Sequence, residues 1–270
     1  LHRPEDAIDD SEVFTMNSLD LYKLKQELLQ AKLCGRAIRE EYQRVASSGV
    51  LPHGAAGRIL YADLCSDVEI FAQGLEAQMT KEKLPDAVLD LALAGFRLTG
   101  VIPNIDAEKL LFYRMAVLKP RDYLSAWITH LSLQAMRLPG YPSRTVFCGV
   151  SGTKIEVKEF GAIDDPESRL ADLIAFYREG MTRPLKFFPD ASMRYADAIR
   201  HGKSEEEALD AARSNWTQSY SGAAADSDDL YIRQCFAESD PFDAEFCENA
   251  LRIFQPLSRA LDAKRGGEGE

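Results

Sequence analysis

The feature that most constrains this chain is a set of three short apolar segments that follow one another closely in its middle. These segments are Val88–Leu93, Phe96–Ile102 and Leu110–Tyr113. Gly95 marks a turn between the first two, and residues 104–109 form a turn before the third. Short apolar runs that are separated by turn residues are typical of β-strands. Three such runs in close succession predict an antiparallel meander.

Helices are predicted on both sides of the three strands. Apolar residues recur at helical spacing over residues 19–45 and 56–79, and again from Pro120 to the Pro139-Gly140 pair. Asn17 is a typical N-cap residue for the first of these helices. Gly35 either breaks that helix or is tolerated within it.

A hairpin and then only helices are predicted in the second half of the chain. Thr145–Val150 and Lys154–Phe160 surround a Ser151-Gly152 turn. Further helices are expected at 166–181, 191–201, 204–217, 227–237 and 242–263. The order of elements predicts an α/β (α+β) fold, with a mixed five-stranded sheet flanked by helices and an all-helical C-terminal part.

Four segments are expected along the chain. They are an extended arm (1–18), a core that carries the sheet (19–183), a C-terminal helical part (184–263) and a disordered tail (264–270). An apolar linker between Pro184 and Pro189 joins the second and third segments. Its Phe187 and Phe188 either dock on another subunit or form a buried strap between the core and the terminal helices.

The charge of the chain is unevenly distributed. The formal net charge is −11, from 32 Lys and Arg against 43 Asp and Glu. Residues 81–160 hold 11 Lys and Arg against 8 Asp and Glu, a net charge of +3, which leaves −14 for the rest. Neutralising phosphates supplies most non-specific affinity for nucleic acid, so the composition argues against a free-standing nucleic-acid binder.

The cysteines and the apolar runs suggest a compartment. The five cysteines are widely spaced without a CxxC pair, and the four histidines are scattered, which does not favour a zinc site. We expect buried, reduced thiols in a cytoplasmic protein. No apolar run approaches the ~18 residues of a membrane helix. The chain begins at Leu1 rather than Met, as we expect of a piece cut from a longer protein.

The chain contains no P-loop, GxGxxG, GxSxG or HExxH motif. Its order of helix, three strands and helix resembles the core of restriction-endonuclease-like nucleases. Such nucleases hold Mg²⁺ with two carboxylates, and a lysine follows the second acid in an acid-x-Lys pattern. In the branch related to RecB the strands read G-x-x-D and D-Y-K, and the next helix carries Q-x-x-x-Y. The corresponding positions in this chain are Pro103, Phe112, Arg114, Ala126 and His130. The resemblance implies the frame of a nuclease with no catalytic residues, metal or cofactor.

The chain also resembles the C-terminal region of the RecC family, the gamma subunit of exodeoxyribonuclease V, from about residue 12 to residue 261. The resemblance is carried by LPHGAAG (51–57), LTG (98–100), LSAWITHL (124–131) and RPLKFFP (183–189), with Trp216 and Pro256-Leu257. It implies a non-catalytic domain of the RecBCD helicase–nuclease, which processes double-strand breaks for repair by recombination. It implies RecB and RecD as partners, and a role in splitting DNA ends and guiding single strands within the complex.

Cationic residues around the degenerate positions are candidates for DNA contact, because Lys and Arg bind phosphates. They are Arg97, Lys109, Arg114, Lys119 and Arg121. The alternative is a solvated face, or pairing with the acids of the chain. Trp127 and His130 share a helix, and core packing is favoured over base stacking because stacking needs exposed rings.

Two other functions stay open on the sequence alone. One is an active Mg²⁺-dependent exonuclease with relocated acids, for which Asp106 is the nearest substitute. A lone Asp in a turn does not replace two converging carboxylates. The other is a purely protein-binding module, with the DNA role in other domains.

Overall fold

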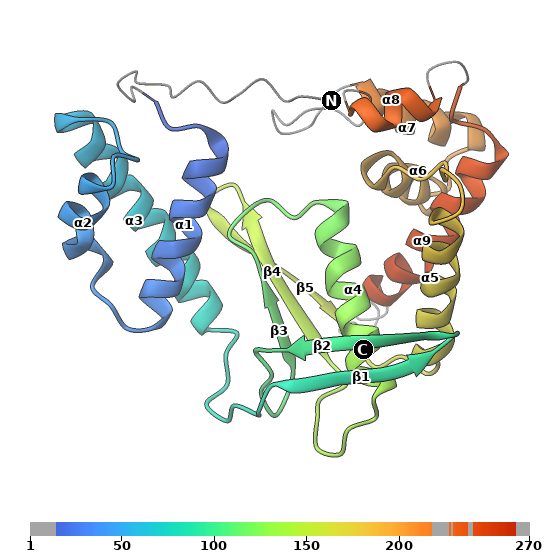
Figure 1. Ribbon diagram of the computed structural model, residues 1–270, viewed down its shortest axis with the longest axis horizontal. Coiled ribbons are helices and arrows are strands. Elements are labelled where there is room, and N and C mark those ends of the chain that lie inside the picture. Colours follow the sequence, from blue (N-terminus) through green and yellow to red (C-terminus); the bar gives the residue numbers. More distant parts are fainter. Residues whose placement is uncertain (1–14, 218–226, 228, 237–239, 263–270) are drawn as a thin grey trace. The chain divides into compact units, whose positions relative to one another are not determined.

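The computed structural model describes residues 15–217, 227, 229–236 and 240–262 (Figure 1). Most of the predicted arm and the whole predicted tail lie outside the described residues. The chain divides into two compact units. Within the described residues, unit 1 comprises 15–79, 113–117 and 148–156, and unit 2 comprises 80–112, 118–147 and the described part of 157–262. The segment boundaries expected after residues 18, 183 and 263 stay predictions.

The helices of unit 1 are α1 (Ser18–Leu33), the 3-10 turn η1 (Ile38–Glu41), α2 (Tyr42–Ser47) and α3 (Gly54–Glu76). The Asn17 side chain caps α1 as predicted, and its Oδ1 accepts the N–H of Asp20 at 2.8 Å. Of the two alternatives for residues 19–45, the structure shows the one in which Gly35 breaks the helix. Gly35 has φ +79°, in the left-handed region that commonly ends helices, and the chain restarts as η1 and α2. The second predicted helix is confirmed as α3.

Unit 1 is held together by a buried apolar seam and a few long-range polar bonds. Leu28 and Leu29 of α1 and Leu75 of α3 are fully buried. The Tyr61 hydroxyl donates to the Ile38 carbonyl oxygen at 2.6 Å, which fixes η1 against α3. A Cβ at Gly57 would lie 1.9 Å from the Pro52 carbonyl oxygen, so only glycine allows the loop to cross the start of α3 this closely.

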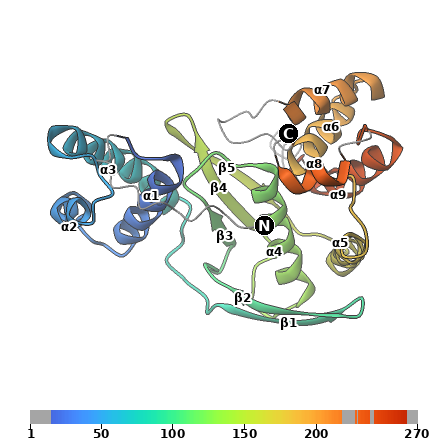
Figure 2. The ribbon, with the colours of Figure 1, turned by 45° about the horizontal axis from the view of Figure 1, so that its top comes forward.

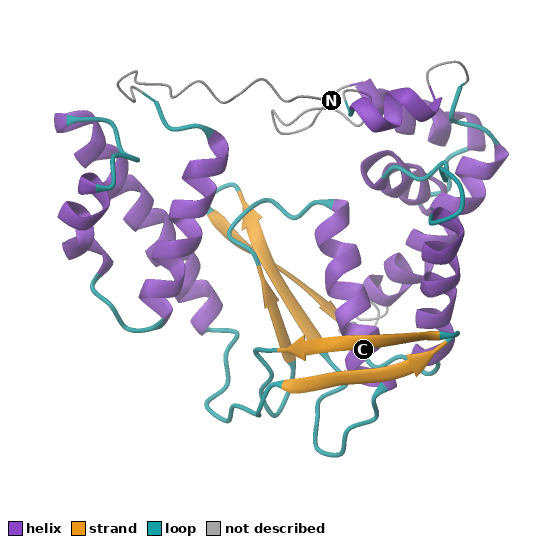
Figure 3. Ribbon diagram, viewed as in Figure 1, coloured by secondary structure: helices purple, strands orange, loops and turns teal. Residues whose placement is uncertain are grey.

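All five predicted strands are present, but they form two sheets (orange in Figure 3). Strands β1 (Ala87–Leu93) and β2 (Phe96–Ile102) pair antiparallel with Leu91 opposite Leu98. Strands β3 (Leu110–Tyr113), β4 (Thr145–Ser151) and β5 (Lys154–Phe160) form a second sheet in the order β3-β4-β5.

The predicted three-strand meander and the single five-stranded sheet are therefore wrong. Asn104 has φ +61°, which turns the chain away from the direction of β2. Ile105 then forms an isolated bridge with Leu110, and the N–H of Leu111 donates to the Asn104 carbonyl oxygen at 2.9 Å. The turn itself, rather than β2, therefore pairs with β3.

Strands β3 and β4 run parallel. The N–H of Leu110 donates to the Arg144 carbonyl oxygen and that of Arg114 to the Cys148 carbonyl oxygen, both at 2.9 Å, so the pairing advances equally on both strands. Helix α4 (Pro120–Ala135) provides the long connection that parallel strands need. The predicted hairpin of β4 and β5 is confirmed, with Gly152 at φ +61° in its turn.

The core of unit 2 lies between α4, the sheet and the helices that follow. Trp127 and Leu131 of α4 are buried with Phe147 and Phe160 of the sheet. Helices α5 (Pro166–Gly180) and α9 (Ala244–Asp262) add apolar side chains to the same cluster.

A second cluster of buried side chains joins α6 (Pro189–Arg200), α7 (Glu205–Thr217) and α9. Figure 2 shows these three helices lying together. With α8 (Leu230–Phe236), the helical C-terminal part is confirmed. The mixed α/β content is confirmed as well. None of the helices in the described part of the chain has the length and apolar character to cross a membrane.

Candidate functional site

Three of the degenerate nuclease positions lie in unit 2 and carry no group that binds a metal. Pro103 is exposed just after β2, Phe112 is partly buried against the apolar core, and Ala126 of α4 is fully buried. Mg²⁺ takes oxygen ligands, preferably from carboxylates and water. None of these three side chains supplies an oxygen.

Asp106, the candidate substitute acid, binds the backbone of the turn that contains it. It accepts the backbone N–H of Thr80 at 3.3 Å, of Glu108 at 2.9 Å and of Lys109 at 2.8 Å. Burial by itself would raise the pKa of Asp106, but the N–H bonds from Glu108, Lys109 and Thr80 lower it below the usual value. The ammonium of Lys109 lies 3.8 Å from the same carboxylate, with its side chain 8% exposed. Asp106 and Lys109 therefore form a buried structural pair.

His130 lies at the degenerate tyrosine position and is buried in α4. Its Nδ1 is 2.8 Å from the Thr145 hydroxyl, and its Nε2 is 2.6 Å from the Gln134 amide nitrogen. The Gln134 amide oxygen accepts the N–H of Ile163 at 2.9 Å, which turns the amide NH₂ toward the ring. Nε2 therefore accepts a hydrogen bond from the Gln134 amide, and the proton of the neutral ring is on Nδ1. Burial lowers the pKa of His130 to about 4, against a smaller opposing effect of a hydrogen bond to the Gly161 backbone.

Trp127 shares this environment. Its ring stacks on His130 with centroids 5.6 Å apart and is 2% exposed. Core packing of both rings is therefore confirmed, and in this state neither ring offers a face to a nucleic-acid base. The partners Gln134 and Thr145 were not foreseen from the sequence. Gln134 follows His130 by four residues, which is the spacing of neighbours on one helix face, and this was the available signal.

A family model for the RecC C-terminal domain matches residues 1–200 of the chain. The chain belongs to this family. It is 25% identical to the RecBCD enzyme subunit RecC of Escherichia coli (strain K12) over 277 residues, which cover 95% of the chain and 23% of that protein. It is 28% identical to RecC of Mycolicibacterium smegmatis over 210 residues, which cover 75% of the chain and 19% of that protein. The chain spans about a quarter of the length of the curated relatives it matches.

In this RecC C-terminal domain, Arg114 belongs to unit 1, where it contacts α1. Its Nε donates to the Tyr22 hydroxyl at 3.2 Å, and its guanidinium lies 5.0 Å from the centroid of the Tyr22 ring. The next tyrosine, Tyr113, accepts a hydrogen bond from Gln30 of the same helix at 3.1 Å. The degenerate lysine position therefore carries a cation that is oriented by a cation–π contact. Nothing in the sequence spacing pointed to Tyr22.

The other candidate cations of the RecC C-terminal domain belong to unit 2 and differ in exposure. Arg97 is exposed and forms a two-point ion pair with Asp90, at 2.6 and 2.7 Å. Lys119 is partly exposed at the N-cap of α4, and Arg121 is exposed on the first turn of that helix. Lys109 is buried, as described above.

The Phe187-Phe188 strap lies inside the RecC C-terminal domain. Phe188 is 1% exposed, and its ring centroid is 4.4 Å from that of Trp216. Phe187 is partly buried, with its ring centroid 5.2 Å from that of Phe176 and 5.8 Å from that of Phe254. The two rings thus enter the two neighbouring apolar clusters of unit 2, which is the buried-strap arrangement. The docking alternative requires exposed rings.

Within the described ranges, no three His, Cys, Asp or Glu side chains gather closely enough to hold a metal ion. All five cysteines are free thiols. Cys65, Cys148 and Cys247 are buried as expected, whereas Cys34 and Cys235 are exposed.

Proposed function

We propose that this chain is a non-catalytic domain of a RecC-type subunit in a RecBCD-like complex of the cytoplasm. It serves as a scaffold that contacts RecB and RecD and guides DNA ends and separated single strands. One observation carries the non-catalytic part. Pro103 and Phe112 stand at the positions that correspond to the two nuclease acids. The Asp106 carboxylate already accepts hydrogen bonds from backbone N–H groups and lies beside the Lys109 ammonium.

The chemistry behind this proposal is that of two-carboxylate metal sites. A nuclease of this type needs Mg²⁺ both to polarise the phosphate and to activate water. To serve that metal, Asp106 would have to release the hydrogen bonds that it accepts from the backbone N–H groups of Thr80, Glu108 and Lys109. A buried donor that is left without an acceptor costs about 1–3 kcal/mol.

The DNA-guiding role is assigned to the cations at the surface. Lys119 and Arg121 of unit 2 are suited to phosphate contact, whereas Arg97 would first have to leave its pair with Asp90. Arg114 of unit 1 is held in a defined orientation by Tyr22. Lys109 is excluded from the candidates for DNA contact because its ammonium is buried. The net charge of −11 opposes free association with DNA, so these contacts would form inside an assembly that supplies further cations.

The first experiment is digestion of end-labelled linear DNA by the purified chain with Mg²⁺, beside a chelator control. We expect no cleavage above the control, because no carboxylate pair is available. Chelator-sensitive cleavage that is lost in Asp106→Asn would show instead that the alternative, a nuclease with relocated acids, is correct.

The second experiment separates DNA guiding from pure protein binding. A photo-crosslinker at Arg121 in the assembled complex should capture forked DNA, and one at exposed Arg58 of unit 1 serves as the matched control. A crosslinking yield at position 121 no higher than at position 58 would favour the protein-binding module.

A further inference from the structure

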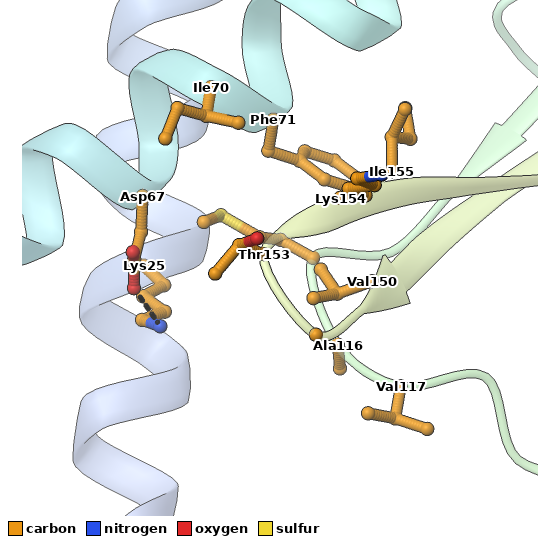
Figure 4. A pocket seen from close by; sticks show the side chains of 12 residues that line it. Lys25, Asp67, Ile70, Phe71, Ala116, Val117, Val150, Thr153, Lys154 and Ile155 are labelled. Atoms are coloured by element: carbon orange, nitrogen blue, oxygen red, sulfur yellow. Dashed lines mark hydrogen bonds and ion pairs between the residues drawn. The ribbon is translucent and has the colours of Figure 1, made fainter.

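Unit 1 contains a cavity that plays no part in the proposed function. Its volume is about 260 Å³, and it lies between helices α1 and α3 on one side and the β4–β5 turn with residues 115–117 on the other (Figure 4). None of its lining residues is a candidate for DNA contact.

The walls of this cavity are mainly apolar. Phe71 of α3 and Ile155 of β5 face it, as do Met115 and Val150. Apolar cavities of about 150 Å³ already take up benzene. The cavity therefore has room for one phenylalanine or leucine side chain.

Two apolar side chains at the rim of the cavity are exposed. Ile70 is 52% exposed and Val117 is 58% exposed, and both line the cavity. A pocket for one side chain that is rimmed by exposed apolar groups is the arrangement of a protein-binding hot spot.

The charges at the rim indicate the kind of segment that would fit. Lys25 and Asp67 pair at 2.8 Å and neutralise each other. Lys154, at the turn between β4 and β5, is exposed and has no acidic side chain within ion-pair distance among the described residues. The rim therefore carries one uncompensated positive charge beside the apolar cavity.

We propose that this cavity binds an acidic peptide segment of a protein partner, which inserts one aromatic or branched aliphatic side chain and places a carboxylate on Lys154. The inserted side chain displaces water from the cavity and covers Ile70 and Val117. The carboxylate sets the direction of the segment across the rim.

The test is fluorescence anisotropy of the whole chain with three labelled hexapeptides. The first is acetyl-Glu-Glu-Leu-Phe-Glu-Glu, the second has Ala-Ala at its centre, and the third has Lys in place of Glu. We expect the first to bind with a Kd on the order of 100 µM, as suits a single anchor, and the other two to bind at least about tenfold more weakly. Equal binding of the first two peptides, or no binding of any, overturns the proposal.

Variants locate the site. Ile70→Glu should abolish binding of the first peptide, and Lys154→Glu should weaken it about tenfold. Val88→Glu on exposed β1 and Lys81→Glu are matched controls outside the cavity and should bind as the unaltered chain does. Circular dichroism and thermal melting confirm that each variant is folded.

If both rim variants bind the peptide normally, the proposal is wrong. If a short oligothymidine binds in a Lys154-dependent way and the peptides do not, the cavity serves nucleic acid and the proposal is also wrong.

Discussion

His130 is uncharged in the folded chain, because burial lowers its pKa to about 4 from an ordinary value of 6.5. Between these two values the unfolded chain binds a proton that the folded chain does not. The free energy of unfolding therefore falls as the pH falls through this window, and the stabilisation is fully present only above pH 6.5. His130 is thus an acid-sensitive core residue.

We predict that lowering the pH from 7 to 5 removes about 2 kcal/mol of stability through His130 alone. In His130→Leu this part of the loss should vanish, although the variant is less stable at pH 7 because the Thr145 hydroxyl loses its partner. Urea denaturation at both pH values measures the difference. His53→Gln, at an exposed histidine, is the control and should keep the full loss. An unchanged pH effect in His130→Leu would contradict the assignment.

The turn between β2 and β3 is the element on which the proposed lack of nuclease activity depends. Its acid holds the backbone of residues 106–109 rather than a metal, and its left-handed residue, Asn104, breaks the meander. One short segment therefore decides both the split of the sheet and the use of Asp106.

We predict that Asp106→Ala destabilises the chain by about 3 kcal/mol, because the backbone N–H groups of Thr80, Glu108 and Lys109 lose their acceptor. Asp106→Asn keeps one acceptor oxygen and should cost less. Chemical denaturation measures both, and addition of a chelator should change neither result. Asp90→Ala is the control, since the exposed pair of Asp90 and Arg97 contributes little to stability. If Asp106→Ala were no more harmful than Asp90→Ala, the structural role of Asp106 would be wrong.

At the scale of the whole molecule, the charge distribution limits what the chain does alone. A segment with a net charge of +3 lies within a chain whose remainder carries −14. Some of its cations are already paired, Arg97 with Asp90 and Arg144 with Glu159. The surface left for phosphate is small.

We predict that the isolated chain binds duplex or single-stranded DNA weakly or not at all at physiological salt. Any binding at low salt should disappear as salt rises, because it depends on counterion release from few contacts. Anisotropy titrations at about 50 and 200 mM salt measure this. A Kd below roughly 1 µM at the higher salt would contradict the prediction, since it would match specific rather than non-specific binders.

The local elements were determined by the sequence because their signals are local. Asn17 caps α1, Ser151-Gly152 closes the hairpin, and Pro166 opens α5, each through the conformation of a few adjacent residues. The inability of Pro103 and Phe112 to bind a metal was equally evident from the sequence, because their side chains carry no ligand atom wherever they lie.

Tertiary structure alone decided which strands pair and which polar side chains are hydrogen-bonded or ion-paired within the protein. A strand pairs with the sheet edge next to which the preceding turn places it. The turn at Asn104 directs β3 away from β2, and β3 pairs with β4. A periodic pattern shows which face of a helix is apolar but not how much of that face is covered. Ile59, one of the apolar residues in the periodic segment 56–79, is 65% exposed. The side chains of Arg114, Asp106 and His130 bind residues that lie up to 92 positions away in the sequence. Only the folded chain brings such residues into contact.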